Sequence, residues 1–223
     1  SDNATPADLG PIFSSSGLDK LAYTPPSTTT LPKQWPTLDS LIGNNTRLMT
    51  FVASLAQTSS QYPYLMDEFT FIFENDYENI SPSNYSCNPN RPTNLGSPST
   101  AQSSGRMFLQ NHFLYSNQLF GIQSPNETYA NVTNAETGFG SLGTALQNCT
   151  AVYNKPANFV LVDFFNVGPA IASVDRANGV SNPVGRKSVS TQPLRQSTGA
   201  GAKERGSLLA VVLAVGVAVA FGA

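Results

Sequence analysis

Two ionisable side chains lie in or just after apolar runs that are typical of buried strands. Asp163 interrupts the stretch NFVLVDFFNVG, Asn158–Gly168, in which Phe and Val predominate. His112, the single histidine of the chain, follows a similar run in RMFLQNHF, residues 106–113. Carboxylates and imidazoles are common proton-transfer groups in enzymes, so both residues are candidate catalytic groups.

Each of these residues also has a structural interpretation. Asp163 is alternatively a carboxylate that accepts hydrogen bonds from backbone N–H groups or caps the helix expected after Gly168. For His112 the alternative is a hydrogen-bonded structural residue, the common role of a lone histidine. Asp67 and Glu68 are expected either to line a polar mouth or to be ordinary surface carboxylates. The sequence leaves these alternatives open.

Composition and spacing argue against several other kinds of site. The 223 residues carry a formal net charge of −2, and 12% of them are charged, so we expect no nucleic-acid partner. No spacing of His, Cys and carboxylates indicates a metal site, and no glycine-rich phosphate loop occurs. We therefore expect no bound cofactor.

Alternating helices and strands are expected to position the candidate groups. Thr5 as N-cap, Pro6, and Gly17 as stop signal predict the first helix. The remaining predicted helices begin at Thr37 and cover 141–153 and 168–179; the predicted strands are 21–23, 47–54, 106–113 and 158–165. The segment 64–75 is ambiguous between helix and strand, and 76–105 is predicted to be a long loop. This alternation implies a parallel sheet, whose carboxyl edge usually carries the chemistry.

Several signals are typical of a secreted protein. Cys87 and Cys149 are expected to form a disulfide in an oxidising compartment, with two buried thiols as the alternative. The N-x-Ser/Thr motif of N-glycosylation occurs seven times. The acceptors are Asn3, Asn44, Asn79, Asn84, Asn126, Asn131 and Asn148. Asn79 is the weakest of them, because Pro82 follows Ser81.

The C-terminus resembles a signal for a glycosylphosphatidylinositol (GPI) anchor. Such a signal needs small residues at the attachment point, a polar spacer and a hydrophobic tail. Ser197 is the expected attachment residue and Gly199 the second choice, followed by the uncharged tail Leu208–Ala223. As a helix this tail would span about 24 Å, short of the ~30 Å hydrocarbon core, which argues against the alternative of a tail anchor. Residues 181–207 are expected to be a flexible stalk and spacer.

The segments WPTLDSLI, RLMTFVAS, PYLMDEFTFIFEN, RMFLQNHFLYSNQLFGI and GFGSLGTALQNCTAVYNKPANFVLVDFFNVG, with the anchor signal, resemble fungal phosphatidylinositol-specific phospholipase C-like phosphodiesterases. The resemblance covers residues 2–179. It implies a (β/α)8 barrel of the TIM type that cleaves phosphodiesters of inositol phospholipids. Some relatives use calcium, but no pattern here locates a calcium site.

The resemblance concerns the second half of such a domain. The family carries one histidine just after the first strand and a second histidine nearby as general base and acid, whereas this chain has His112 alone. About four strands are predicted in a core of about 180 residues, below the ~250 typical of a complete barrel. We therefore expect an α/β fold comprising about the last four β/α units. In the family a carboxylate orients the general-base histidine, and Asp163 resembles that group.

The expected organisation has three parts: residues 1–180 as the barrel half, 181–207 as the stalk and 208–223 as the removable tail. We expect a phosphoric diester hydrolase-like protein of the phospholipase C type, acting in lipid metabolism at the outer cell surface or cell wall, and inactive without the missing strands. Its expected partners are the membrane, through the anchor, and an inositol phospholipid or another phosphodiester. The alternative is a non-catalytic GPI-anchored surface protein that uses the same scaffold.

Overall fold

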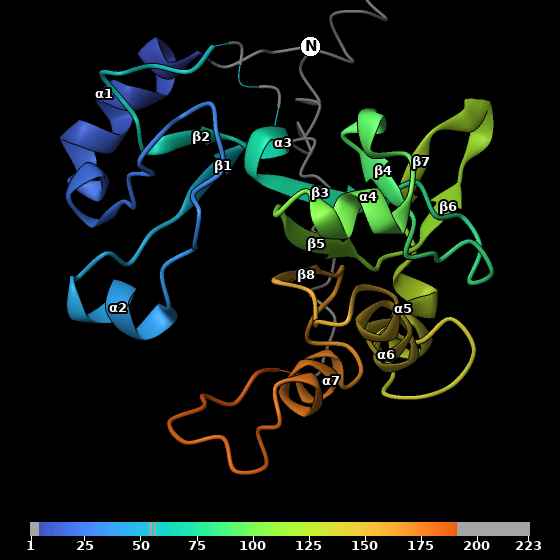
Figure 1. The fold of residues 1–223 in the computed structure, drawn as a ribbon. Helices are drawn as coiled ribbons and strands as arrows, with labels where there is room; N and C mark the ends of the chain where they lie inside the picture. Colours follow the sequence, from blue (N-terminus) through green and yellow to red (C-terminus); the bar gives the residue numbers. More distant parts are fainter. Residues whose placement is uncertain (1–4, 54, 56, 191–223) are drawn as a thin grey trace, which may run out of the picture. The chain divides into compact units, whose positions relative to one another are not determined.

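A four-stranded sheet forms the centre of the part of the chain that the computed structural model describes, residues 5–53, 55 and 57–190 (Figure 1). Its strand order is β4-β3-β5-β8. The strands are β3 (Ile72–Asn75), β4 (Pro89–Arg91), β5 (Met107–Asn111) and β8 (Phe159–Leu161). β3, β5 and β8 run parallel, and β4 pairs antiparallel to β3. The parallel arrangement expected from the sequence is present, but no barrel closes within these residues.

The described part of the chain also contains two smaller sheets, each of two strands. β1 (Thr50–Val52) and β2 (Leu65–Asp67) are parallel, and an isolated bridge joins Ala22 to Leu48. β6 (Tyr115–Asn117) and β7 (Gln123–Pro125) form an antiparallel hairpin that follows β5. Because this hairpin lies at the carboxyl end of β5, it stands beside the edge of the sheet at which the candidate groups are found.

The predicted helix signals act as expected. In α1 (Pro6–Ser16) Thr5 and Asp8 form a capping box, and Gly17 ends the helix with φ 75°. Side chains also cap α2 (Leu38–Gly43) and α6 (Leu142–Tyr153), through Thr37 and Ser141. The remaining α-helices are α3 (Glu68–Phe71), α4 (Pro98–Ser103), α5 (Ala130–Thr133) and α7 (Ala170–Ala177). Short 3₁₀ turns are η1 (Leu18–Leu21), η2 (Thr93–Leu95), η3 (Leu119–Gly121) and η4 (Glu127–Tyr129).

The structure resolves one ambiguity of the sequence and corrects two expectations. The ambiguous segment 64–75 contains both strand and helix, since the single turn α3 separates β2 from β3. The predicted loop 76–105 contains β4 and α4. The last strand ends at Leu161, so Asp163 lies just beyond it, where Asn134 Nδ2 donates to the Asp163, Phe164 and Val167 carbonyls at 2.9–3.1 Å.

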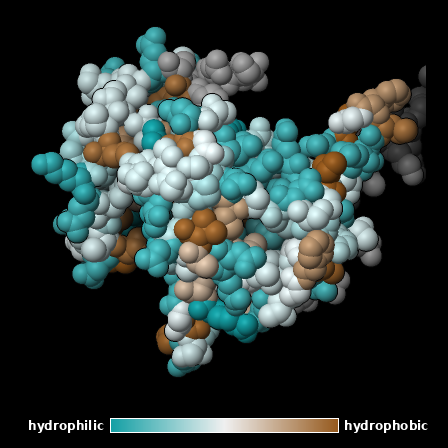
Figure 2. Space-filling view, turned by 45° about the vertical axis from the view of Figure 1, so that its right-hand side comes forward, coloured by the Kyte–Doolittle hydropathy of each residue, from teal (hydrophilic) through white to brown (hydrophobic). Residues whose placement is uncertain are grey.

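The two faces of the central sheet pack against different elements. One face places Phe73 and Phe108 against Cys149 and Tyr153 of α6. Val160 of β8 continues this layer towards Leu142 and α7. The other face packs Ile72, Met107 and Phe159 in a second cluster with Phe71 and Trp35. On the surface shown in Figure 2, hydrophilic side chains predominate and the hydrophobic ones form small separate groups.

The described part of the chain contains no helix with the length and apolar character needed to cross a bilayer. The proposed anchor residues Ser197 and Gly199, the tail 208–223 and the acceptor Asn3 lie outside the described residues.

Candidate functional site at the carboxyl edge of the sheet

Polar side chains gather where β3, β5 and β8 end. Glu74, 2% exposed, pairs with Arg91 of the neighbouring strand β4 and accepts a 2.9 Å hydrogen bond from Asn111 Nδ2. The guanidinium of Arg91 lies over the rings of Phe69 and Tyr77, with its central carbon 5.0 and 4.0 Å from their centroids. A buried carboxylate is stable only when it is paired, and these contacts supply that pairing.

Strand alternation separates the polar groups into two sets. Glu74 and Asn111 share the face of Ile72 and Met107, which packs away from α6. Gln110 and His112 share the face of Phe108, which packs against α6. The first set is therefore on the surface that a closed barrel would turn inward, and the second is on its helix-covered surface.

Asp163 is half-buried close to two tyrosines. Burial raises the pKa of its carboxyl group above the ordinary value. Burial of Tyr115 and Tyr85 raises the pKa of each hydroxyl, and the nearby Asp163 charge raises both further. The pKa of Tyr85 reaches about 12. A carboxyl group with a raised pKa is suited to exchanging protons or to holding a cationic partner.

His112 is held in the interior, with 1% of its surface exposed. Its Nε2 lies 3.1 Å from the Thr133 carbonyl and so donates to it, and its backbone N–H donates to Leu161 at 2.8 Å. The ring of Tyr85 stacks on the imidazole with centroids 4.0 Å apart. Burial lowers the pKa of His112 to about 4, although the Thr133 and Gly140 backbones favour the protonated ring. Near neutral pH the imidazole is therefore uncharged.

The free nitrogen of this imidazole, Nδ1, has no hydrogen-bond partner in the described part of the chain. The Gly140 backbone favours the protonated ring, as the Thr133 carbonyl does. With the proton on Nε2, Nδ1 is an acceptor.

Tyr85 connects the two candidates that the sequence singled out. Its ring contacts His112, and Asp163 lies close enough to its hydroxyl to raise the pKa. Asp163 and His112 are thus neighbours of one tyrosine. The two other carboxylates expected at a polar mouth have separate roles. Asp67 is the N-cap of α3, where its side chain accepts a hydrogen bond from the Thr70 backbone N–H. Burial and the nearby charge of Glu74 raise the pKa of Glu68.

Sequence reasoning missed Glu74, Arg91, Asn111 and Tyr85. The sequence does contain a signal for Glu74, because a glutamate in the apolar run FIFEN is expected to be buried and therefore requires a charged partner. The partner, Arg91, lies in the segment 76–105, which the sequence predicts to be a loop. Among the described residues no group of three or more His, Cys, Asp or Glu side chains could hold a metal ion.

Comparison with known proteins identifies the family. The family profile described as PI-PLC X matches residues 1–178. The chain belongs to the PI-PLC X family. The parallel strands β3, β5 and β8 and the polar edge described above are therefore features of a PI-PLC X domain.

Two PI-PLC X relatives come from Arthroderma benhamiae. One is named "Uncharacterized secreted protein" and is 39% identical over 165 residues, which cover 72% of this chain and 36% of the relative. The other, "PI-PLC X domain-containing protein 1", is 36% identical over 164 residues, covering 74% of this chain and 51% of the relative. The chain thus spans about half, or less, of the length of these relatives. No solved structure matches significantly.

Proposed function

We propose that this chain supplies the carboxyl-terminal strands of a phospholipase C-type phosphodiesterase of the TIM-barrel class. The observation that carries the proposal is the PI-PLC X match over residues 1–178, together with a parallel sheet whose carboxyl edge gathers Glu74, Arg91 and Asp163. The substrate we propose is a phosphodiester, with an inositol phospholipid as the first candidate. The remaining strands, and the general acid and base, come from residues outside this chain.

In this scheme Asp163 is a positioning residue. It holds a histidine of the missing strands in the correct tautomer and stabilises the imidazolium formed when the attacking hydroxyl loses its proton. The raised pKa of Asp163 in this chain supports the role, because a half-buried carboxylate gains from a cationic partner. Arg91 lies at the same edge, where its charge is balanced by the buried Glu74.

The test uses this chain extended by the strands and the histidine pair that the proposal places outside residues 1–223. Wild type should release a water-soluble phosphorylated head group from vesicles containing phosphatidylinositol. Asp163→Asn should fold normally and lower turnover by roughly 10²- to 10⁴-fold, the usual contribution of acid–base catalysis. Asp39→Asn changes an exposed aspartate on α2 in the same chemical way and should leave turnover unchanged. Undiminished turnover in Asp163→Asn, measured per folded molecule, would sink the proposal for this residue.

The second candidate function is a non-catalytic surface protein. It is favoured by His112, the single histidine, which is buried, neutral near pH 7 and donates to a backbone carbonyl. The same vesicle assay separates the two functions. A folded longer protein that contains the family's histidine pair and still releases no head group would favour the non-catalytic function.

For localisation we propose the outer face of the plasma membrane or the cell wall, through a GPI anchor at Ser197. The relative named as a secreted protein and the disulfide in this chain support an extracellular location. Enzymatic cleavage of the GPI lipid on intact cells should release the wild-type protein. Replacing Ser197 and Gly199 with bulky residues should abolish attachment. Release of wild type by detergent alone would indicate a tail anchor.

A further inference from the structure

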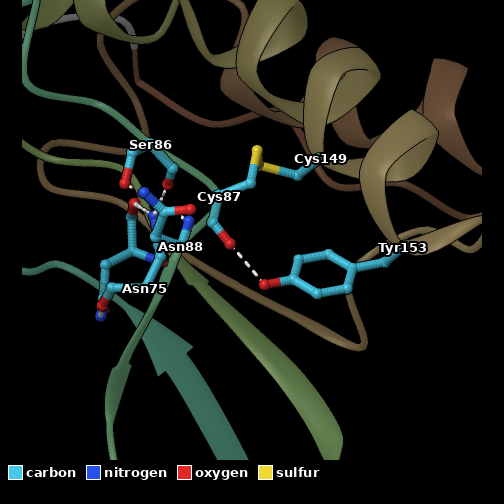
Figure 3. Close-up of a disulfide and its surroundings, with 7 residues drawn as sticks. Asn75, Ser86, Cys87, Asn88, Cys149 and Tyr153 are labelled. Atoms are coloured by element: carbon cyan, nitrogen blue, oxygen red, sulfur yellow. Dashed lines mark hydrogen bonds between the residues drawn. A yellow bond between two sulfur atoms is a disulfide. The ribbon is translucent and has the colours of Figure 1, made fainter. Parts of the chain in front are cut away.

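A cavity of about 180 Å³ lies between the sheet and α6, on the face opposite to Glu74 and Asn111. Gln110 of β5 and His112 just after it line the cavity, with Tyr85 and Cys87 from the loop between β3 and β4 and Ala145 and Cys149 from α6. It is therefore distinct from the edge assigned to phosphodiester chemistry. Figure 3 shows how the Cys87–Cys149 disulfide joins the loop to the helix at this place.

Two buried polar groups of this cavity lack partners. Gln110 and His112 are each 1% exposed, and neither Gln110 Oε1 nor His112 Nδ1 has a hydrogen-bond partner in the described part of the chain. Leaving a buried polar atom unpaired is costly, so such atoms normally face a ligand or ordered water. The Gln110 amide offers both donors and an acceptor, and His112 Nδ1 offers an acceptor.

The lining also limits the charge of an occupant. None of the lining residues is Asp, Glu, Lys or Arg, and the imidazole is neutral. An ionic group would lose its hydration here without gaining a counter-charge. A neutral molecule with hydroxyl groups fits, because each hydroxyl can donate to Nδ1 or Oε1 and accept from the amide. At about 15–30 Å³ for each water molecule, the volume suits roughly six to twelve waters, or one small molecule that displaces them.

We propose that the cavity between β5 and α6 is a binding site for a small, neutral, hydroxyl-rich molecule, a polyol or a monosaccharide, held by Gln110 and His112. The proposal does not depend on phosphodiesterase activity. Such a ligand has two sources. It is either free in solution or the sugar attached at Asn148, an exposed acceptor that lines the same cavity.

Ligand-observed NMR on the folded chain tests the proposal, first on protein produced in a host that adds no N-glycans, so that Asn148 remains an uncharged amide. Glycerol and D-glucose are the probes, and glycerol 3-phosphate is the charged counterpart. We expect saturable binding of the neutral probes in the millimolar range, since few atoms make contact. Glycerol 3-phosphate should bind at least tenfold more weakly. No saturable signal from either neutral probe, or equal binding of glycerol and glycerol 3-phosphate, would overturn the proposal.

Three variants assign the signal to this cavity. Gln110→Met keeps the side-chain length but removes the amide, and it should weaken binding at least tenfold. Ala145→Met fills the space from α6 without removing a hydrogen bond, so it carries the test if Gln110→Met does not fold. Gln147→Met makes the same exchange at an exposed position of α6 and should bind as wild type does. Undiminished binding in Ala145→Met would contradict the assignment.

Protein that keeps its glycans distinguishes the two sources. If the sugar at Asn148 occupies the cavity, free glucose should fail to bind the glycosylated protein and should bind glycosylated Asn148→Gln. If the ligand is free in nature, glycosylated wild type should bind glucose as the protein made without glycans does. Both results support the proposed chemistry, and each identifies one source of the ligand. Failure of glycosylated Asn148→Gln to bind glucose, while wild type made without glycans binds it, would contradict Asn148 as the source.

Discussion

Asn75 and Asn111, the last residues of β3 and β5, exchange three hydrogen bonds. The Asn111 backbone N–H donates to Asn75 Oδ1 at 2.6 Å, and the side-chain amide of each residue donates to the backbone carbonyl of the other at 3.1 Å. Asn75 Nδ2 also donates to Ser86 at 3.0 Å, and Asn111 Nδ2 to Glu74. The pair therefore ties the two strands to the loop that carries Tyr85 and Cys87.

Replacing either asparagine of this pair should destabilise the fold more than the small change in side-chain volume suggests. Asn75→Leu or Asn111→Leu leaves buried polar groups of the other residue unpaired, which costs about 1–3 kcal/mol in the free energy of unfolding. In the double variant both sets of side-chain groups are absent, so the loss should be smaller than the sum by about 1 kcal/mol or more. Urea unfolding of the four proteins measures this coupling.

Asn117→Leu is the matched control, because Asn117 is an exposed residue of β6. It should change the free energy of unfolding by less than about 0.5 kcal/mol. Simple additivity of Asn75→Leu and Asn111→Leu would show that the three hydrogen bonds do not act as a unit.

Local signals explain which parts of the fold were predictable. Caps at Thr5, Thr37 and Ser141 and the left-handed Gly17 depend on residues a few positions apart, and the predicted helix starts are confirmed. Which side chains of a helix are buried depends on tertiary packing. In α1 Ile12 is 60% exposed, whereas the adjacent Phe13 stacks on Tyr64.

Long-range contacts explain what was missed. β4 has the sequence Pro-Asn-Arg, with no strand pattern of its own, and it pairs because Arg91 lies opposite Glu74 in β3. The last strand is shorter than its apolar run, and just beyond it the side-chain amide of Asn134, 29 residues earlier, donates to the Asp163 carbonyl. Neither contact joins residues that are close in the sequence, so local patterns do not predict it. Of the candidate site, the sequence therefore predicts only the separate residues Asp163 and His112.

The disulfide expected from the sequence is present, since Cys87 and Cys149 are bonded across a sequence separation of 62 residues. It fixes the loop to α6, where the Tyr153 hydroxyl donates to the Cys87 carbonyl (Figure 3). Closing a loop of this length restricts the unfolded chain, so Cys87→Ser together with Cys149→Ser should lower stability by about 4 kcal/mol.

Thiol labelling and urea unfolding check this prediction. In denaturant without reductant, wild type should label at no cysteine, because the chain holds two cysteines and both are bridged. Ser86→Ala beside the bridge retains both cysteines and serves as the control. Two labelled thiols in the secreted wild-type protein would contradict the bridge. Equal stability of wild type and the Cys87→Ser, Cys149→Ser variant would contradict its energetic role.

His112 should make stability fall in mild acid. Its pKa is about 4 in the folded protein because of burial, against an ordinary value of 6.5, so between these values the unfolded chain binds more protons. Stability is therefore complete above about pH 6.5 and is lost as the pH falls towards 4, by up to about 3 kcal/mol. The measurement is the free energy of unfolding in urea at pH 7 and at pH 4.5.

His112→Gln isolates this contribution, since a glutamine does not titrate. The raised pKa values of Asp163 and Glu68 act in the opposite direction, because those carboxyls hold their protons more strongly when folded. They are present in both proteins and cancel in the difference. The stability of wild type should fall more than that of His112→Gln by about 2 kcal/mol or more between the two pH values. Parallel profiles would show that His112 titrates normally.

The acceptor asparagines differ in exposure, so we expect only some of them to carry glycans. Asn44, Asn84, Asn131 and Asn148 are exposed, Asn126 is half-buried, and Asn79 is 1% exposed. The side-chain nitrogen of Asn79, to which a sugar would be attached, donates to the Asp76 carbonyl at 3.0 Å. Its backbone carbonyl accepts from Tyr115 at 2.8 Å, which joins this turn to the hairpin.

A sugar at Asn79 would therefore prevent the turn from packing, so the folded, secreted protein should carry none there. Peptide mass spectrometry should find glycans at the exposed acceptors and an unmodified Asn79. Asn79→Ala should lower stability by about 1–2 kcal/mol through the unpaired Asp76 carbonyl, whereas Asn44→Ala on the surface should be neutral within about 0.5 kcal/mol. A glycan at Asn79 in folded protein would contradict the buried position of this side chain, since attachment requires the nitrogen to be accessible.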